Sequence, residues 1–166
     1  MLPIRPLLTG IGVVAVAQFL FSPCEAAPRE GSTVLMPENP QNRALWERWG
    51  FSEAVVRGDT VYLSGVVAGL REGETDPAAA YDRAFRQIGS ILERAGSSWD
   101  DVMEMTTYHT DITGIEAFIA VKNNYVRAPF PAWTAIDVDR LVPPNGLVEI
   151  RVIAARRGAG PAAAAR

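Results

Sequence analysis

Few side chains in this 166-residue sequence are suited to catalysis or to metal binding. The chain has one histidine, His109, and one cysteine, Cys24, so a disulfide within the chain and a metal cluster of cysteines and histidines are both excluded. We interpret His109 as a strand residue satisfied by hydrogen bonds, with a catalytic role as the alternative. We therefore expect no metal and no cofactor.

Two residues near the C-terminus, Trp133 and Glu149, are candidates for a binding site. Successive side chains of a strand point to opposite faces, so Trp133 points away from the side that carries Ala132, Thr134, Ile136 and Val138. Glu149 similarly alternates with the valines and isoleucines of the run 147–154. We predict that both side chains stand on the face opposite the core.

The strands that would carry these two residues flank a loop. The turn Pro143–Gly146 contains two prolines, an asparagine and a glycine, and separates the stretches 130–141 and 147–154. This pattern predicts a β-hairpin with a longer loop. A second, tighter hairpin is predicted around Gly58 and Asp59, followed by a loop over residues 66–74.

Two amphipathic helices complete the predicted layer. The first is capped at residues 75–77, where a proline takes the first helical position, and ends at Gly96. A strand over residues 102–111 follows, and then a helix that opens at the capping-box spacing of residues 113–116. Lys122 interrupts the apolar stripe of this second helix. The order β-β-α-β-α-β-β predicts an α+β fold with helices on one face of a mixed sheet.

The N-terminal residues 1–26 have the pattern of a secretory signal peptide. One positive charge, Arg5, precedes an uncharged apolar run and small residues that suit cleavage after Ala26 or Ala27. An uncleaved membrane anchor is the alternative, but the run is shorter than the ~20 residues that a spanning helix needs. We expect a periplasmic or secreted protein that is not attached to a membrane after cleavage.

The rest of the chain is predicted to be one domain with short extensions. Residues 27–49 form an N-terminal extension, residues 50–156 the domain, and residues 157–166 a disordered tail. The extension is expected to be irregular up to Pro40 and then helical, with three apolar side chains on one side that pack on the domain or form a lid or a subunit contact. The net charge of -3 does not favour nucleic-acid binding. Those apolar side chains are Leu45, Trp46 and Trp49.

Five motifs, in the right order, resemble the RidA/YjgF family, which is also labelled endoribonuclease L-PSP. The resemblance covers roughly Gly50 to Arg156. It implies a chorismate-mutase-like α+β fold, a homotrimer with its sheets turned inward, and small-molecule clefts between subunits. The best-known members hydrolyse reactive imines and enamines to keto acids and ammonia. The motifs are residues 54–65, 95–102, 108–111, 131–134 and 148–154.

Most of the site that the resemblance implies is changed in this sequence. In the deaminating members an arginine follows Pro-Ala and grips the substrate carboxylate, and here that position is Trp133. The expected tyrosine is Phe51, and the glutamine after Ser-Gly is Val66. The expected asparagine of the second helix is Lys122, and the expected cysteine is Ala135.

Glu149 remains, with Ser64 and Gly65 beside it, and the resemblance implies that Glu149 orients or activates a water. The alternative is an ion pair with Arg151, two residues along the same strand face. Trp133 is assigned either to interface packing or to stacking on a ligand. Two further candidates for binding the substrate are Lys122, which is otherwise a solvated helix residue, and Arg127, which could replace the missing guanidinium.

We therefore expect an exported trimer that binds a small molecule between subunits, as a hydrolase of altered specificity without standard imine deaminase activity. One alternative is an active imine or enamine deaminase that uses Glu149, and another is a non-catalytic trimer that binds a more apolar ligand. Ribonuclease activity is the least favoured, because the chain is acidic and has no pair of histidines for acid and base catalysis.

Overall fold

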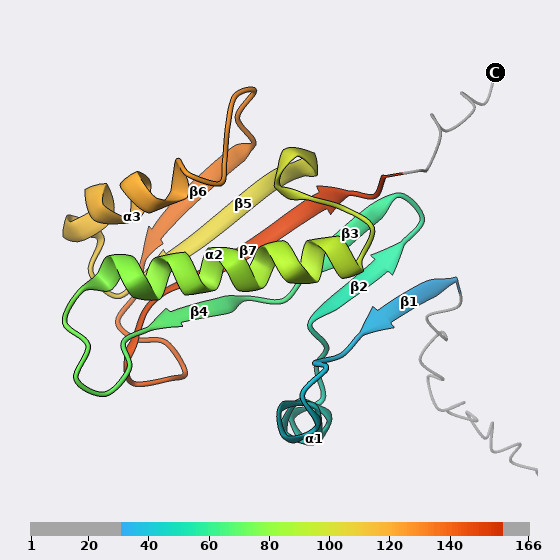
Figure 1. Cartoon of the computed structure of the whole chain (residues 1–166), viewed down its shortest axis with the longest axis horizontal. Helices are drawn as coiled ribbons and strands as arrows, with labels where there is room; N and C mark the ends of the chain where they lie inside the picture. The colour runs from blue at the N-terminus through green and yellow to red at the C-terminus, as the bar shows by residue number, and fades with distance from the viewer. Residues whose placement is uncertain (1–30, 158–166) are drawn as a thin grey trace, which may run out of the picture. The chain divides into compact units, whose positions relative to one another are not determined.

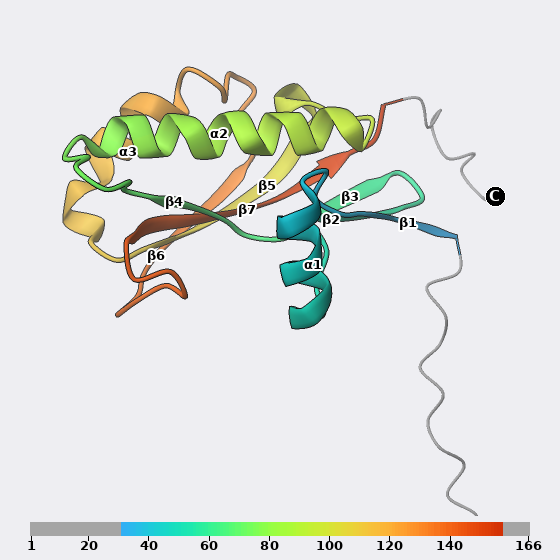
Figure 2. The same ribbon diagram turned by 60° about the horizontal axis from the view of Figure 1, so that its bottom comes forward.

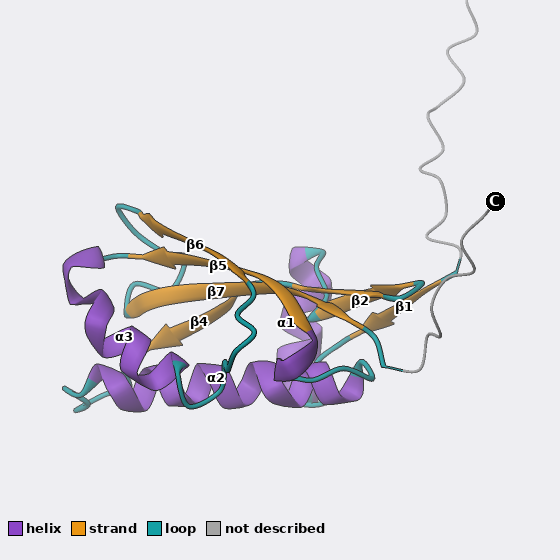
Figure 3. Ribbon diagram, turned by 90° about the horizontal axis from the view of Figure 1, so that it is seen from above, coloured by secondary structure: helices purple, strands orange, loops and turns teal. Residues whose placement is uncertain are grey.

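The computed structural model describes residues 31–157, which form a seven-stranded sheet with helices packed on one face. Figure 1 shows the long helix α2 lying across the sheet, and Figure 3 shows α2 and α3 together on the same face. Two short 3-10 turns, Trp99–Asp101 and Ile112–Gly114, join the elements. The helices and strands are β1 (Ser32–Leu35), α1 (Pro40–Trp49), β2 (Ala54–Arg57), β3 (Thr60–Leu63), β4 (Val66–Gly69), α2 (Pro77–Arg94), β5 (Val102–His109), α3 (Ile115–Lys122), β6 (Ala132–Asp137) and β7 (Gly146–Ala155).

The ten-residue strand β7 is the centre of the sheet. The strand order is β1-β2-β3-β7-β5-β6, and β4 pairs with the first half of β7 while β3 pairs with the second half. Every pairing is antiparallel except that of β5 with β6, which is parallel. The predicted α+β layer with a mixed sheet is therefore confirmed.

The predicted hairpin between the last two strands is wrong, because β5 lies between β6 and β7. The connection from β5 to β6 runs through α3, and a helix that crosses over a sheet returns the chain parallel to the strand it left. The chain then passes through the turn at Pro143–Gly146 and enters the sheet on the other side of β5. The turn chemistry was recognised correctly, but it joins strands that are not neighbours.

Helix α2 agrees with its sequence signals. The Asp76 side chain accepts a hydrogen bond from the backbone N–H of Ala78 at 2.9 Å, and Pro77 takes the first helical position. Gly96, just beyond the helix, has a φ of 77°, which favours glycine over residues with a Cβ atom. The apolar stripe of α2 packs on the inward residues of β4 and β7 to form the core. Its buried residues are Ala80, Tyr81, Ala84, Phe85, Ile88, Ile91 and Leu92.

Two segments that were expected to be irregular are strands. β1 lies within the N-terminal extension and pairs with β2, and β4 replaces the predicted loop after Gly65. Both strands have only four residues and too little periodicity to be recognised alone. β2 and β3 are equally short, but the tight turn at Gly58 and Asp59 reveals them. The expected signal segment, residues 1–26, and the tail beyond residue 157 lie outside the described residues.

The helix after residue 113 begins differently from the prediction. The expected capping box is replaced by a 3-10 turn in which the Asp111 carboxylate accepts hydrogen bonds from the backbone and hydroxyl of Thr113. Helix α3 then starts at Ile115 without a side-chain cap. Helix α1 confirms the short helix predicted in the extension; Figure 1 shows it end-on beyond β2 and β4, and Figure 2 shows it from the side.

Candidate functional site

Glu149 stands in the middle of β7, on the sheet face that α2 does not cover. Its neighbours across the sheet are Val67 on β4 and Tyr108 on β5. The side chain is partly buried, and this burial raises the pKa of its carboxyl above the ordinary value. Arg151 forms its ion pair with Glu104 at 3.7 Å, and no ion pair involves Glu149 among the described residues. The alternative of a Glu149–Arg151 pair is therefore wrong.

A bulge in the neighbouring strand makes room for this carboxylate. Tyr62 lies opposite Ile153, but Val66, four residues further on, lies opposite Ile150, only three residues back. One extra residue is thus inserted between β3 and β4, as in a β-bulge. A Cβ atom on Gly65, inside this irregular step, would lie 1.8 Å from Glu149 Oε1. Only glycine leaves the space that the carboxylate occupies.

Ser64, the other residue of the bulge, uses its hydroxyl to hold the local fold. Ser64 Oγ donates a hydrogen bond to the carbonyl of Ser52 at 2.7 Å, and its backbone N–H donates to the carbonyl of Glu53 at 2.9 Å. Both bonds tie the bulge to the segment that leads into β2. The Ser64 oxygen can still accept a hydrogen bond from a ligand, because a hydroxyl has two lone pairs.

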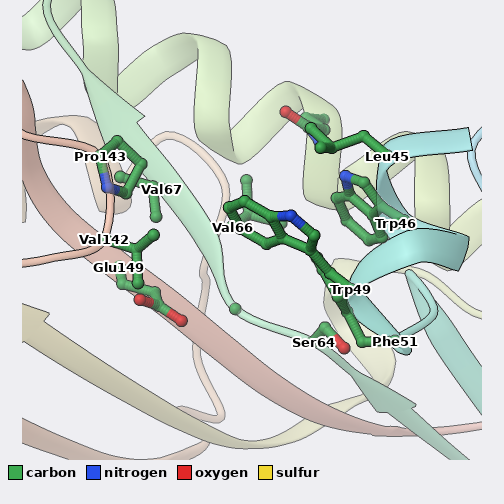
Figure 4. Close-up of a pocket in the computed structure, with 12 residues that line it drawn as sticks. Leu45, Trp46, Trp49, Phe51, Ser64, Val66, Val67, Val142, Pro143 and Glu149 are labelled. Carbon is green, nitrogen blue, oxygen red and sulfur yellow. The ribbon is translucent and has the colours of Figure 1, made fainter. Parts of the chain in front are cut away.

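The carboxylate and the bulge line a pocket of about 660 Å³. Figure 4 shows aromatic side chains of α1 and its C-terminal end on one side of the pocket, and the loop before β7 together with Glu149 on the other. The rings of Trp46 and Phe51 stack with centroids 4.2 Å apart. The predicted apolar side of α1 therefore covers a cavity. The pocket is lined by Leu45, Trp46, Trp49, Phe51, Ser64, Gly65, Val66, Val67, Gln87, Val142, Pro143 and Glu149.

Trp133 does not share this pocket, which corrects the predicted pairing of Trp133 with Glu149. In the parallel register Trp133 lies opposite Met105, which is buried under the helices. Its indole N–H donates a hydrogen bond to Thr107 Oγ1 at 3.0 Å, and His109 Nε2 lies 2.9 Å from the same oxygen. Alternation along β6 was assigned correctly, but its inner and outer faces were exchanged. The error arose because the side of β6 that carries Thr134 and Ile136 was taken as its core side, whereas both residues are exposed.

A second pocket, of about 300 Å³, lies beside Trp133 and contains Lys122. Lys122 is buried at the end of α3, so the alternative of a solvated helix residue is wrong. Its Nζ lies 5.1 Å from the centroid of the Trp133 ring and 5.9 Å from that of Phe130. Burial lowers the pKa of the amine from its ordinary value. We call this the lysine pocket, and its lining residues are Met105, Lys122, Asn123, Val126, Phe130, Pro131 and Trp133.

The other sequence candidates are settled more simply. His109 is buried, hydrogen-bonded to Thr107, and set edge-on to Phe118 with ring centroids 5.1 Å apart, which agrees with its interpretation as a strand residue. Burial also lowers the pKa of its imidazole. Arg127 is exposed and lines neither the pocket of Glu149 nor the lysine pocket. It therefore does not take the place of the expected guanidinium within one chain.

Sequence reasoning missed three contributors to the larger pocket. Gln87 reaches it from the polar side of α2, and Val142 and Pro143 reach it from the loop before β7. These residues carry no motif, and only the folded arrangement brings them together. Within residues 31–157 no cluster of histidine, cysteine, aspartate and glutamate side chains is suited to a metal ion, and no helix in that range has the length and hydropathy of a membrane span.

Comparison with known proteins places this geometry in context. Residues 42–156 match the family model described as endoribonuclease L-PSP. The RutC family protein YjgH of Escherichia coli is 33% identical over 115 residues, which are 67% of this chain and 86% of that protein. A protein named 2-iminobutanoate/2-iminopropanoate deaminase from Capra hircus is 33% identical over 108 residues, which are 63% of this chain and 78% of that protein.

Solved structures show the same arrangement of strands and helices. A member of the YjgF/YER057c/UK114 family from Mycobacterium tuberculosis superposes with a TM-score of 0.64 at 27% identity, covering 75% of this chain and 98% of that one. A protein named RidA from an Antarctic Psychrobacter species gives a TM-score of 0.58 at 34% identity, covering 64% of this chain and 88% of the other.

Proposed function

The chain belongs to the endoribonuclease L-PSP family, also called RidA/YjgF, and we propose that it binds a small, largely apolar molecule beside Glu149 as a hydrolase of altered specificity. One observation carries this proposal. Among the described residues Glu149 is the only ionisable side chain that lines the pocket of about 660 Å³, and the other walls are mostly aromatic and aliphatic. The apolar walls favour a neutral, flat ligand, and the carboxylate disfavours an anionic one.

The chemistry that suits this setting is hydrolysis of a carbon–nitrogen double bond. A carboxylate whose pKa is raised by burial can take a proton from water as the water attacks the carbon. The same carboxyl can then return the proton to the departing nitrogen, so that an imine and water become a carbonyl compound and an amine or ammonia. The aromatic walls contributed by Trp46 and Phe51 hold the substrate and exclude bulk water.

We also propose that the chain lacks standard imino-acid deaminase activity. A substrate carboxylate needs a cationic partner, and the pocket lining includes no arginine, lysine or histidine among the described residues. A hydrogen bond to a charged group contributes about 1.5–3 kcal/mol. Its absence lowers turnover of a carboxylate substrate at least about tenfold, since each ~1.4 kcal/mol is a factor of ten.

The second candidate is an active imine or enamine deaminase, and relatives favour it. Proteins about one third identical to this chain are named 2-iminobutanoate/2-iminopropanoate deaminases. The bulge at Ser64 and Gly65 and the carboxylate of Glu149 form one unit that could serve the same reaction. This candidate requires that another group holds the substrate carboxylate.

Keto-acid release from a freshly generated 2-aminoacrylate-type imine separates the two candidates. The native chain, Trp133→Arg and Glu149→Ala are compared with Glu104→Ala, a matched loss of a carboxylate from the same sheet face outside the pocket. We expect little activity from any of them, because Trp133 faces the helices and an arginine there would lack the supporting groups. Robust native activity that disappears only in Glu149→Ala would establish the deaminase instead.

A direct binding assay tests the favoured function itself. The stacked Trp46 and Phe51 form the pocket wall, so a bound aromatic or aliphatic imine should change the tryptophan fluorescence. We expect neutral imines to saturate this signal and to be hydrolysed, with hydrolysis lost in Glu149→Ala and binding retained. If neutral imines neither change the fluorescence nor are hydrolysed, the proposed function is wrong.

We further propose that the protein is an exported homotrimer with clefts between subunits. The uncovered sheet face carries exposed apolar side chains, including Tyr62 at 42% and Ile136 at 38% exposure, which is typical of a surface that packs on another copy. The signal-like residues 1–26 support a periplasmic or secreted location.

A further inference from the structure

Lys122 is the only lysine in the sequence. The other 15 of the 16 basic residues are arginines, so this chain places arginine at every other position that needs a positive charge. Arginine keeps its proton in proteins, whereas a lysine amine can lose its proton and act as a nucleophile. A lone lysine in a buried position is therefore chemically distinct from the rest of the cationic groups.

The surroundings of Lys122 stabilise a charge poorly. The residue is only 7% exposed, and its Nζ donates one hydrogen bond, to Asn123 Oδ1 at 2.9 Å. No aspartate or glutamate of the described residues lies within ion-pair distance of it. The rings of Phe130 and Trp133 offer cation–π contacts, which offset only part of the cost of desolvation.

These features match the general requirements for an amine that attacks carbonyl groups. Such lysines are desolvated in an apolar pocket, so that a larger fraction of the amine is neutral near neutral pH. Burial lowers the pKa of Lys122, which increases the neutral fraction of its amine. The pocket beside it, of about 300 Å³, supplies the space for a small organic molecule at the nitrogen.

We propose that Lys122 is a nucleophilic amine that forms a Schiff base with small, neutral aldehydes or ketones in the lysine pocket. The nitrogen lone pair attacks the carbonyl carbon, and the resulting carbinolamine loses water, so that a C=N bond replaces the C=O bond. The reaction consumes no oxidant or reductant, and water reverses it. Asn123 positions the amine by accepting its hydrogen bond.

The walls of the lysine pocket define the class of carbonyl compound. Phe130 and Trp133 present aromatic faces, and Met105, Val126 and Pro131 complete an apolar lining without a second cation. A flat aromatic aldehyde fits this lining, whereas a keto acid would bring a carboxylate with no partner other than the amine that must react. This inference does not depend on the proposed role of Glu149, which lies on the opposite face of the sheet.

Reductive trapping tests the proposal. The protein is incubated with benzaldehyde and cyanoborohydride at neutral pH, so that hydride reduces the C=N bond to a stable secondary amine. Intact mass and peptide mapping then measure the modification at residue 122 separately from that at the N-terminal α-amine. The matched control is Lys122→Met combined with Arg127→Lys, which moves the only lysine to an exposed site five residues away.

We expect residue 122 of the native protein to be modified measurably faster than the relocated lysine, because burial lowers the pKa of its amine and so raises the neutral, nucleophilic fraction. We also expect 4-carboxybenzaldehyde to react more slowly than benzaldehyde at residue 122 but equally fast at the relocated lysine. Circular dichroism confirms that the control is folded. Equal rates at both positions, or modification of the α-amine alone, would show that Lys122 is only a packing residue.

The result of reductive trapping at Lys122 does not depend on whether Glu149 catalyses hydrolysis. Glu149→Ala leaves the lysine pocket intact, so trapping at Lys122 should be unchanged in this variant. Normal trapping at Lys122 without imine hydrolysis would refute the proposed hydrolase and support the nucleophilic lysine. Imine hydrolysis without trapping at Lys122 would refute the nucleophilic lysine and support the hydrolase.

Discussion

The carboxylate of Glu149 occupies the space that a side chain at residue 65 would need, since a Cβ atom on Gly65 would lie 1.8 Å from Glu149 Oε1 and 2.5 Å from its Cδ. The two residues belong to different strands, β7 and the bulged step between β3 and β4. The bulge therefore fixes where this carboxylate can stand in the larger pocket, and no other ionisable side chain of residues 31–157 lines that pocket. Substitutions at Gly65 and Glu149 can therefore test whether the carboxylate occupies this space.

Gly65→Ala should displace the Glu149 carboxylate and destabilise the fold by about 1–3 kcal/mol, the usual range for an overpacked site. In the background of Glu149→Ala the same substitution should cost much less, because the colliding atoms are gone. Urea unfolding of the two single variants and the double variant measures this coupling. Additive effects would show that the carboxylate does not occupy this space in solution.

Glu149→Gln should stabilise the protein at neutral pH. Burial raises the pKa of Glu149 in the folded state, so the unfolded state loses the proton first as the pH rises above the ordinary value of 4.5. The ionised carboxylate thus costs stability above its folded pKa, and this cost disappears below 4.5, where both states are protonated. Unfolding midpoints of the two proteins, followed from acid to neutral pH, should diverge as the pH rises. A constant difference across that range would contradict the pKa shift.

Light scattering of the mature protein should give about three chains per particle at micromolar concentration. Tyr62→Asp, on the uncovered face of the sheet, should reduce that number, because a charge on an apolar contact surface disfavours association. Arg86→Asp on the exposed side of α2 is the matched control and should leave the assembly unchanged. A native monomer would rule out clefts between subunits.

Expression of the full sequence in a host with a secretory pathway should yield a mature chain that begins at Ala27 or Pro28. The apolar run and the small residues before Ala27 provide the cleavage pattern. Intact-mass analysis of the protein from the periplasm or the medium gives the new N-terminus. A protein that retains its first 21 residues would contradict the export proposal.

The parts of the fold that depend on local signals could be predicted from the sequence. Asp76, Pro77 and Gly96 mark the ends of α2, and the buried stripe between them has the helical period. The position of Glu149 on the open face was also correct, because β7 alternates regularly over ten residues. In each case the deciding information lies within one element.

The errors arose where distant segments decide the structure. Nothing near β6 shows that β5 will separate it from β7, so Trp133 was assigned to the wrong face. The lysine pocket was not predicted for the same reason. Lys122 lies on α3 and Trp133 on β6, and these elements come together only when the crossover places them side by side. Sheet pairing is set by contacts between elements, and the alternation of one strand does not reveal its partner.

The central strand of the sheet is also the last of the described strands along the chain. β7 spans Gly146–Ala155 and pairs with β3, β4 and β5, so these three strands have no common partner until residues 146–155 have been synthesised. Pairing between segments so far apart in sequence makes folding slow and late. A nascent chain that ends before residue 146 therefore leaves the apolar faces of α2 and the earlier strands exposed. The sheet consequently cannot close before β7 has left the ribosome, and chaperone binding to the unfinished chain should act on these faces.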